Sequence, residues 1–430
     1  FEGGFTLAAG LDYVVDYCKN LQFEQGELDY LRKMNQKDGT PMFAPAFLDY
    51  LKELRFTCDI DAVEEGTVVF PNAPMVQVKG SLIQCQLLET PLLNILNFQT
   101  LIATKAARIN LAAQGAPVME FGLRRAQGID GALAASRASY IGGCSSTSNV
   151  MAGKLFDIPV SGTHAHSWIL SFDSELEAFY AYAEAFPDHC VFLVDTYDTL
   201  AGVKNAIQVG LSLRKKGKEM LGIRIDSGDL AYFSIQARQL LDDAGFPNAK
   251  VYASNDLDEY IITSLKSQDA AIDVWGVGTK LVTAFDQPAL GAVYKLSAIK
   301  NASGSWVPKV KVSQQSLKIN IPGIHKVRRY FSKGKAVADM IYLEGQAIDP
   351  QGIMIIDPND ATQRKRLMPS FYVEEELLKP IFRKGELVYS LPSLQQIRER
   401  AGIQLEAFDK THKRLTNPHV YPVGLEEKLH

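Results

Sequence analysis

The sequence lacks an excess of positive charge. Its 430 residues carry 45 lysines and arginines against 49 aspartates and glutamates, which gives a formal net charge of −4 at pH 7 and a pI near 6.0. A protein that coats nucleic acid or an anionic membrane needs a dominant basic field. We therefore expect neither nucleic acid nor a membrane as a partner, and any bound phosphate must be held by a local site.

Cysteine is scarce, and long apolar runs are missing. The five cysteines form no CxxC pair, so the pattern predicts neither a disulfide framework nor a zinc site and favours a reducing cytoplasm. Residues 87–109 come nearest to a membrane span, but polar residues interrupt the roughly 18 apolar positions that a span needs. We expect a soluble protein without a signal peptide, and because the chain opens on Phe1 we expect a native leader before it.

The length and the 47% hydrophobic content predict a globular protein of two or three domains. Residues 1–115 mix helical and strand patterns and end in a long helical stretch over 87–113, which predicts an N-terminal α/β domain. Residues 296–430 have the patterns of antiparallel strands followed by a helix over 391–415, and we expect them to pack with the N-terminal domain. A basic stretch predicts either a solvated face or side chains that reach phosphates across an interface; it contains Lys309, Lys311, Lys326, Arg328 and Arg329.

Between these segments, residues 116–295 contain seven short apolar runs, each followed by polar or glycine residues and then a helical segment. From His166 to Asp195, Asp226 and Asn255 the spacing is about 30 residues, the length of a strand, a crossover helix and the next parallel strand. We expect an irregular, incomplete α/β barrel as the catalytic domain, with an open doubly wound sheet as the alternative. In both folds the ligand site lies at the carboxyl ends of the strands.

The segment GTHAHSW (162–168) places His164 and His166 on one face if it is extended. They could be a metal-binding pair, as in barrel hydrolases, although no other strand-end histidine completes such a site. They could equally be hydrogen-bonded structural histidines. A third interpretation makes one of them a nucleophilic or phosphate-handling histidine whose imidazole is oriented by Asp195 at the end of the next apolar run. Asp198 is either a second acid or a helix N-cap.

Three further clusters suit a phosphorylated ligand. In IRIDSGDL, Arg224 and Asp226 alternate onto one side and can address a sugar phosphate together, unless they form an internal ion pair capped by Ser227. The loops ASND (253–256) and GVGTK (276–280) bring small residues and backbone N–H groups before a helix, which favours an anion cradle. In EFGLRRAQG (120–128), an aromatic ring beside cations suits a flat anionic ring or a surface patch.

Seven motifs, in this order and spacing, resemble the nicotinate phosphoribosyltransferase family of type II phosphoribosyltransferases: EFGLRRAQG, GCSSTSN, GTHAHSW, VDTYDT, IRIDSGD, SNDLDE and GVGTKL. The likeness runs from EGGF (2–5) to NPHVYPV (417–423), although the family's TDLYQ-like segment has no counterpart before Phe1. The resemblance implies condensation of nicotinate with phosphoribosyl pyrophosphate for NAD salvage. It also implies coupling to ATP through a phosphorylated His166, a need for Mg²⁺, and a homodimer with shared active sites.

The resemblance also implies roles for individual residues. Asp195 would orient His166, while Arg224 and Asp226 would bind the ribose and pyrophosphate, and His164 would face the same pocket in a supporting role. The 5′-phosphate would be held by Ser254, Asn255, Gly278 and Thr279. Ser227 and Lys295 would also bind phosphate, Lys295 across a subunit interface. The pyridine ring would be held by Phe121, Arg124, Arg125, Ser148 and Asn149.

Specificity depends on the group that faces the ring substituent. Ser148 and Asn149 carry no charge where the related nicotinamide enzyme has an aspartate, and Arg125 replaces a glycine of that enzyme. An anionic substrate is therefore favoured. The alternatives are a nicotinamide-type transferase, a metal-dependent barrel hydrolase and a non-catalytic relative that binds nucleotide.

Overall fold

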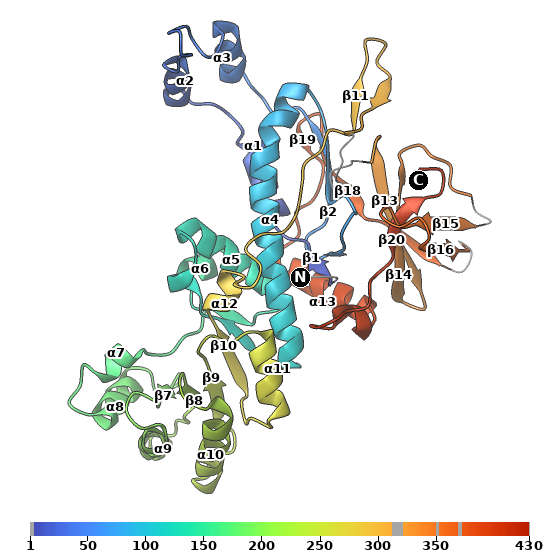
Figure 1. Cartoon of the computed structure of the whole chain (residues 1–430). Coiled ribbons are helices and arrows are strands. Elements are labelled where there is room, and N and C mark those ends of the chain that lie inside the picture. Colours follow the sequence, from blue (N-terminus) through green and yellow to red (C-terminus); the bar gives the residue numbers. More distant parts are fainter. Residues whose placement is uncertain (1–3, 312–320, 350–351, 369–371, 430) are drawn as a thin grey trace.

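The computed structural model describes residues 4–311, 321–349, 352–368 and 372–429. A single long helix, α4 (Leu82–Ala113), runs through the molecule and joins its two halves (Figure 1). The 87–113 pattern predicts this helix, but the helix starts about one turn earlier, after the Ser81 N-cap. Pro91 lies inside it. Among the described residues, no helix combines the length and the apolar character needed to cross a membrane.

One half of the molecule contains a six-stranded parallel sheet. Its strand order is β6 (Ser146–Thr147), β5 (Val118–Glu120), β10 (Val274–Val277), β9 (Lys250–Ala253), β8 (Gly222–Ile225) and β7 (Val191–Leu193). Apolar strands such as β7 and β10 are buried throughout because helices cover them. The curled sheet is open between β6 and β7, which confirms the expected incomplete α/β barrel.

One of the seven apolar runs, the third along the chain, does not form the strand that its pattern predicts. Residues 158–162 add only one parallel bridge, Val160 to Thr147, at the free edge of β6. Pro159 has no N–H to donate, so a longer ladder is disfavoured there. The barrel is therefore open at the point where GTHAHSW leaves the sheet.

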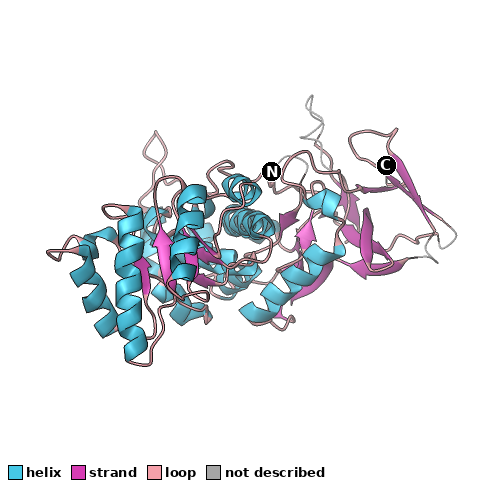
Figure 2. Ribbon diagram, turned by 90° about the horizontal axis from the view of Figure 1, so that it is seen from below, coloured by secondary structure: helices cyan, strands magenta, loops and turns pink. Residues whose placement is uncertain are grey.

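Helices connect these strands and cover them, as Figure 2 shows on its left side. They are α5 (Ile129–Ile141), α6 (Val150–Phe156), α7 (His166–Ile169), α8 (Glu175–Ala185), α9 (Thr199–Lys215), α10 (Leu230–Asp243), α11 (Glu259–Ser267) and α12 (Thr279–Val282). Several begin at an aspartate whose carboxylate accepts a backbone N–H of the first turn. Asp198 caps α9 in this way, at 2.8 Å from Ala201 N, so the N-cap interpretation of Asp198 is confirmed.

The two chain ends build the other half together. The strands β2 (Asp59–Val63) and β4 (Val76–Lys79) share a sheet with β18 (Leu378–Arg383) and β19 (Glu386–Leu387), in the order β19-β18-β2-β4. Close by, β1 (Thr6–Leu7) pairs with β3 (Val68–Val69), and the short helices α1 (Leu11–Lys19), α2 (Gln25–Arg32) and α3 (Pro45–Lys52) follow the N-terminus. This confirms the α/β domain expected from both terminal segments.

A second six-stranded sheet belongs to the C-terminal segment. Its order is β16 (Arg364–Leu367), β15 (Ile353–Ile356), β20 (Val423–Glu426), β14 (Lys335–Leu343), β13 (His325–Ser332) and β17 (Val373–Glu376). A hairpin of β11 (Ala298–Lys300) and β12 (Trp306–Pro308) precedes it. The predicted helix is α13 (Leu394–Ala407), which starts at the Ser393 capping box and stops eight residues short of the prediction, before a 3-10 turn over 410–413.

The expectation of a solvated basic face is wrong for β13. Arg329 is fully buried, and its guanidinium pairs with Asp339 across the strands at 2.7 Å. Arg328 pairs with Glu374 and Glu376 on the neighbouring β17. Strand pairing therefore surrounds these cations with carboxylates, because antiparallel neighbours place side chains directly opposite one another.

Candidate active site

His166 lies where the ends of three chain segments meet. It is the first residue of α7, its Nδ1 lies 3.1 Å from Thr196 Oγ1, and 39% of its side chain is exposed. Its Nε2 lies 3.6 Å from Asp226 Oδ2, just after β8, and 3.9 Å from Asp195 Oδ1, just after β7. The structure thus brings together an accessible imidazole and two carboxylates from successive strand ends.

Asp195 divides its two oxygens between two tasks. Its Oδ2 accepts the Asp226 backbone N–H at 2.8 Å and the Ser227 hydroxyl at 2.7 Å, so it fixes the loop that follows β8. Its Oδ1 is buried without a hydrogen-bond partner among the described residues, and at 3.9 Å its approach to His166 is longer than a hydrogen bond. The imidazole is held instead through Nδ1 by Thr196, a residue that the sequence analysis missed.

Arg224 and Asp226 lie on the same side of the strand end. The Arg224 guanidinium donates to Thr163 Oγ1, and its Nη2 lies 3.9 Å from Asp226 Oδ1, which accepts the Ser254 hydroxyl. Arg224 Nε is buried and lacks a hydrogen-bond partner within the described ranges, and burial lowers the pKa of this guanidinium. The 3.9 Å between Arg224 Nη2 and Asp226 Oδ1 is longer than a hydrogen bond. Ser227 does not cap this ion pair, because its hydroxyl donates to Asp195. The guanidinium therefore keeps a donor for a ligand.

His164 does not share the pocket of His166, contrary to the expectation from alternation. The segment stops being extended where α7 begins, so the two side chains no longer point the same way. His164 is buried against Tyr182, and its Nε2 accepts the Leu193 N–H at 3.2 Å from the free edge of β7. Burial and the charge of Arg224 lower the pKa of His164 to about 4, so the ring is neutral. It is a structural histidine that accepts a backbone N–H from the unpaired edge of β7.

The predicted phosphate loops converge around Gly276. A Cβ at this glycine would lie 2.8 Å from the Phe121 ring and 3.4 Å from Ser254 Cβ, so the ends of β5, β9 and β10 meet there. Asn255 is exposed at a φ of 92°, and Gly278 precedes α12, where Thr279 is half-buried. Lys280 is engaged elsewhere, because its Nζ pairs with Asp258 Oδ2 at 2.7 Å.

Lys295 lies far from this cradle within one chain. Asp286 pairs with Lys105 of α4, whereas Tyr294 packs in the core cluster that contains Cys85 of the same helix. Cys85 and Lys105 are twenty residues apart in α4, which is about 30 Å at 1.5 Å per residue. The structure of a single chain therefore does not bring Lys295 to Ser254 and Gly278.

The predicted ring-binding residues divide into two sets. Phe121 sits at the end of β5, and Arg124 and Arg125 follow in an exposed 3-10 turn; the charge of Arg124 acts on Arg224. Ser148 is half-buried. Asn149 is buried and structural, because its side chain accepts Ala152 N–H as the cap of α6 and donates to Ser136. Its contact with the ring substituent stays a prediction, which has to use the second N–H or the second lone pair of this amide.

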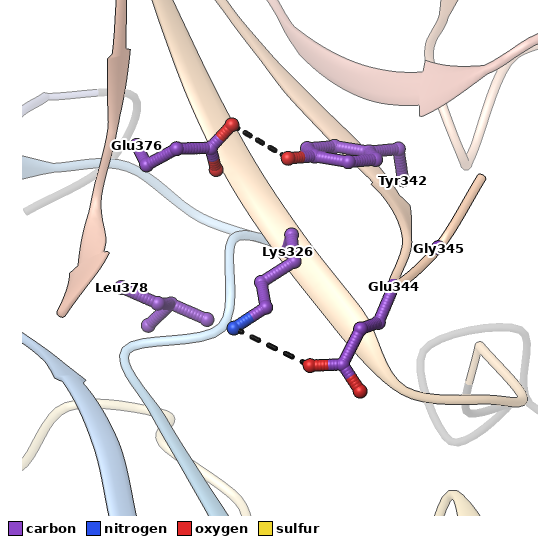
Figure 3. A pocket seen from close by; sticks show the side chains of 6 residues that line it. All are labelled: Lys326, Tyr342, Glu344, Gly345, Glu376 and Leu378. Atoms are coloured by element: carbon purple, nitrogen blue, oxygen red, sulfur yellow. Dashed lines mark hydrogen bonds and ion pairs between the residues drawn. The ribbon is translucent and has the colours of Figure 1, made fainter. Parts of the chain in front are cut away.

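A polar cavity of about 260 Å³ lies elsewhere, in the C-terminal half of the chain (Figure 3). Its charged groups bond to one another: Lys326 Nζ lies 3.6 Å from Glu344, and the Tyr342 hydroxyl donates to Glu376 at 2.5 Å. No strand end of the parallel sheet contributes to it. Within the described ranges, no three histidine, cysteine, aspartate or glutamate side chains gather as metal ligands either.

Comparison with known proteins decides between the remaining interpretations. Three family models match: the nicotinate phosphoribosyltransferase N-terminal domain over residues 1–97, the family itself over 117–320, and its C-terminal domain over 324–430. The chain belongs to the nicotinate phosphoribosyltransferase family.

Relatives in this family match along their length. The nicotinate phosphoribosyltransferase of Bacillus subtilis is 45% identical over 99% of this chain and 86% of its own. The human one is 33% identical over all of this chain and 88% of its own. The crystal structure of human nicotinic acid phosphoribosyltransferase superposes with a TM-score of 0.86 at 30% identity, covering 99% of this chain and 91% of that one. Nicotinate phosphoribosyltransferases are enzymes, so the hydrolase and non-catalytic alternatives are set aside.

In addition to Thr196, the sequence analysis missed two other residues of this nicotinate phosphoribosyltransferase site, Thr163 and Glu120. Thr163 accepts from Arg224, and Glu120 is buried at the end of β5, where its carboxylate accepts from Thr147 at 2.5 Å and from Ser136 at 2.9 Å. Thr163 and Thr196 each stand next to a singled-out residue, which is the signal that could have found them. Glu120 organises the loop before Arg124 and Arg125.

Proposed function

We propose that this chain condenses nicotinate with phosphoribosyl pyrophosphate, giving nicotinate mononucleotide and pyrophosphate, and that ATP hydrolysis drives the reaction through a phosphorylated His166. One observation carries the proposal: the half-exposed imidazole lies 3.6 Å from Asp226 Oδ2, while Asp226 Oδ1 lies 3.9 Å from Arg224 and accepts the hydroxyl of Ser254 in the predicted phosphate loop. One phosphorylated sugar would then contact three groups: the phosphoryl acceptor His166, the Asp226 carboxylate that stabilises a developing cation, and the anion cradle.

Each group has a distinct task. Cleavage at the anomeric carbon develops positive charge, which the Asp226 carboxylate stabilises where it is already held by Ser254. The buried guanidinium of Arg224 binds a phosphate of the leaving pyrophosphate. The imidazole, oriented by Thr196, attacks the terminal phosphorus of ATP and releases ADP, and water later displaces phosphate from the phosphohistidine.

Magnesium fits this site. Asp195 Oδ1 is buried without a partner in the part of the chain that the structure describes, and Asp226 Oδ2 faces the same imidazole, so one or two carboxylate oxygens are available. Mg²⁺ typically takes such a pair together with water and substrate phosphates, and it would supply charge neutralisation of the pyrophosphate. We also propose that the enzyme works in the reducing cytoplasm, consistent with five free cysteines.

The reaction is tested by incubating the purified chain with labelled nicotinate, phosphoribosyl pyrophosphate, ATP and Mg²⁺. We expect one nicotinate mononucleotide and one pyrophosphate per turnover, formed faster with ATP than without it. Chelation of Mg²⁺ should abolish activity, and added Mg²⁺ should restore it. Labelled nicotinamide should react poorly. Turnover of nicotinamide in preference to nicotinate would instead support the nicotinamide-type alternative, and product formation at the same rate without ATP would reject the coupling.

Arg125 is proposed to bind the nicotinate carboxylate. Arg125→Gly should raise the KM for nicotinate roughly 10- to 100-fold, because a hydrogen bond to a charged group contributes about 1.5–3 kcal/mol. Initial rates at varied nicotinate concentration measure this change. Arg125→Lys, which keeps the charge, should show a smaller rise. A KM unchanged in the glycine variant would remove Arg125 from the ring site.

A second copy of the chain would bring Lys295 to the site. Because Tyr294 packs near Cys85 whereas Asp286 pairs with Lys105, about 30 Å further along α4, we propose a homodimer in which Lys295 of one chain reaches a phosphate held by the other. Sedimentation velocity measures the assembly. A monomer that is fully active would reject the shared site.

A further inference from the structure

Two of the five cysteines meet away from the active site. Cys58 lies just before β2 and is fully buried, and Cys85 lies in the first turn of α4 and is half-buried. Their side chains approach one another beside Gly80, and we call them the thiol pair. Both thiols belong to the core cluster between α4 and the sheet that contains β2 and β18. Neither takes part in the reaction proposed above.

The local chain path explains this contact. A Cβ at Gly80 would lie 2.2 Å from Cys58 Sγ, so only a glycine lets the turn between β4 and α4 pass over this sulfur. Gln84 then ties the two segments together: its Oε1 accepts Thr57 N–H at 2.9 Å and lies 3.4 Å from Cys58 Sγ, and its Nε2 donates to Arg55 O at 2.9 Å. The thiol pair is thus held by packing and by hydrogen bonds on both sides.

The two sulfurs have unlike environments. The interaction with Cys58 lowers the pKa of Cys85 to about 7, with further help from the Gly80 backbone N–H at the start of a 32-residue helix. The same contact, together with burial, raises the pKa of Cys58. Burial raises the pKa of Cys144 to about 12 and that of Cys190 to about 11. At neutral pH, Cys85 therefore has far more thiolate than these buried thiols.

We propose that the thiol pair is a modification site for hydroperoxides, in which Cys85 is the attacking thiol and Cys58 the resolving thiol. The Cys85 thiolate attacks one oxygen of hydrogen peroxide, the O–O bond breaks, and hydroxide leaves a sulfenic acid on Cys85. The Cys58 thiol then attacks that sulfur, the S–O bond breaks, water leaves and a disulfide forms. Two thiols lose two electrons and the peroxide is reduced to two waters; a low-molecular-weight thiol reverses the change.

The disulfide would act on a functional segment of the chain. Tyr294 packs in the same core cluster, and burial followed by the nearby Cys85 and Cys58 raises the pKa of its hydroxyl. Lys295 is the next residue. Oxidation would therefore change the packing around Tyr294, next to the proposed phosphate ligand Lys295. This effect on Lys295 rests on the proposed function, whereas the chemistry of the thiol pair does not.

The first test is alkylation of the intact, reduced protein by iodoacetamide between pH 5 and pH 9, with each cysteine peptide quantified by mass spectrometry. We expect Cys85 to react with a midpoint near pH 7 and, at pH 7, at least roughly tenfold faster than Cys144 and Cys190. Hydrogen peroxide should then yield a Cys58–Cys85 linked peptide that dithiothreitol removes. Equal alkylation rates, or no linked peptide, would overturn the proposal.

Variants separate the two roles. In Cys58→Ala the interaction that lowers the pKa of Cys85 is gone, so the alkylation midpoint should move upward, and peroxide should leave a sulfenic acid that dimedone traps. Cys85→Ser should abolish both the fast alkylation and the disulfide, whereas the matched Cys144→Ser should change neither. An unmoved midpoint in Cys58→Ala would reject the pairing. Since the alkylation and disulfide tests use no substrate, they decide this proposal whether or not the enzyme assay succeeds.

Discussion

The His166→Ala variant is expected to take up no acid-labile, base-stable label from ATP labelled in its terminal phosphate, whereas the wild-type chain becomes labelled. The imidazole of His166 is half-exposed among strand ends and is the proposed phosphoryl acceptor. Without it, ATP should no longer accelerate product formation, and the ATP-dependent rate should fall by roughly two orders of magnitude or more. Filter binding after acid or base treatment measures the label, and product assays measure the rate.

A matched control lies on the same half of the molecule. His189 is exposed in the turn before β7, outside the cluster, so His189→Ala should label like the wild type. Thr196→Val should still label, but more slowly, because Nδ1 loses its partner at 3.1 Å and the ring is less well oriented. Label that persists in His166→Ala would assign the phosphoryl group to another residue.

The strand-end chemistry could be predicted from the sequence because it follows a period. Buried parallel strands are short and apolar, their crossovers have nearly constant length, and their carboxyl ends share one edge. Asp195, Arg224 and Asp226 were therefore placed together by spacing alone, and the structure puts them within 4 Å of His166 or of one another. Local rules were also enough for the Asp198 cap.

The errors arose where a local pattern competes with another structure. Alternation failed at His164 because a helix begins at His166. Lys295 could not be placed, since its position depends on the chain running back along α4. The pairing of Arg329 with Asp339 depends on the register of β13 and β14, which a single sequence does not display.

Asp226→Asn is expected to lower kcat by roughly 10²–10³-fold, the effect of removing one group that stabilises developing charge. Asparagine keeps the size of the side chain and an oxygen that can accept the Ser254 hydroxyl, so it removes the charge and leaves the position unchanged. The KM for phosphoribosyl pyrophosphate should change by only about two- to threefold, because the carboxylate acts chiefly in the transition state. Steady-state kinetics with saturating nicotinate and ATP measure both constants.

The control for Asp226→Asn stands three residues further along the same loop. Asp229 is exposed and caps α10 by accepting Tyr232 N–H at 3.0 Å, and asparagine caps a helix as well as aspartate does. Asp229→Asn removes the same charge from the same loop and should leave kcat near that of the wild type. Equal losses in both variants would point to the loop's overall charge. A rise in KM with kcat unchanged would make Asp226 a binding group whose charge acts equally on substrate and transition state.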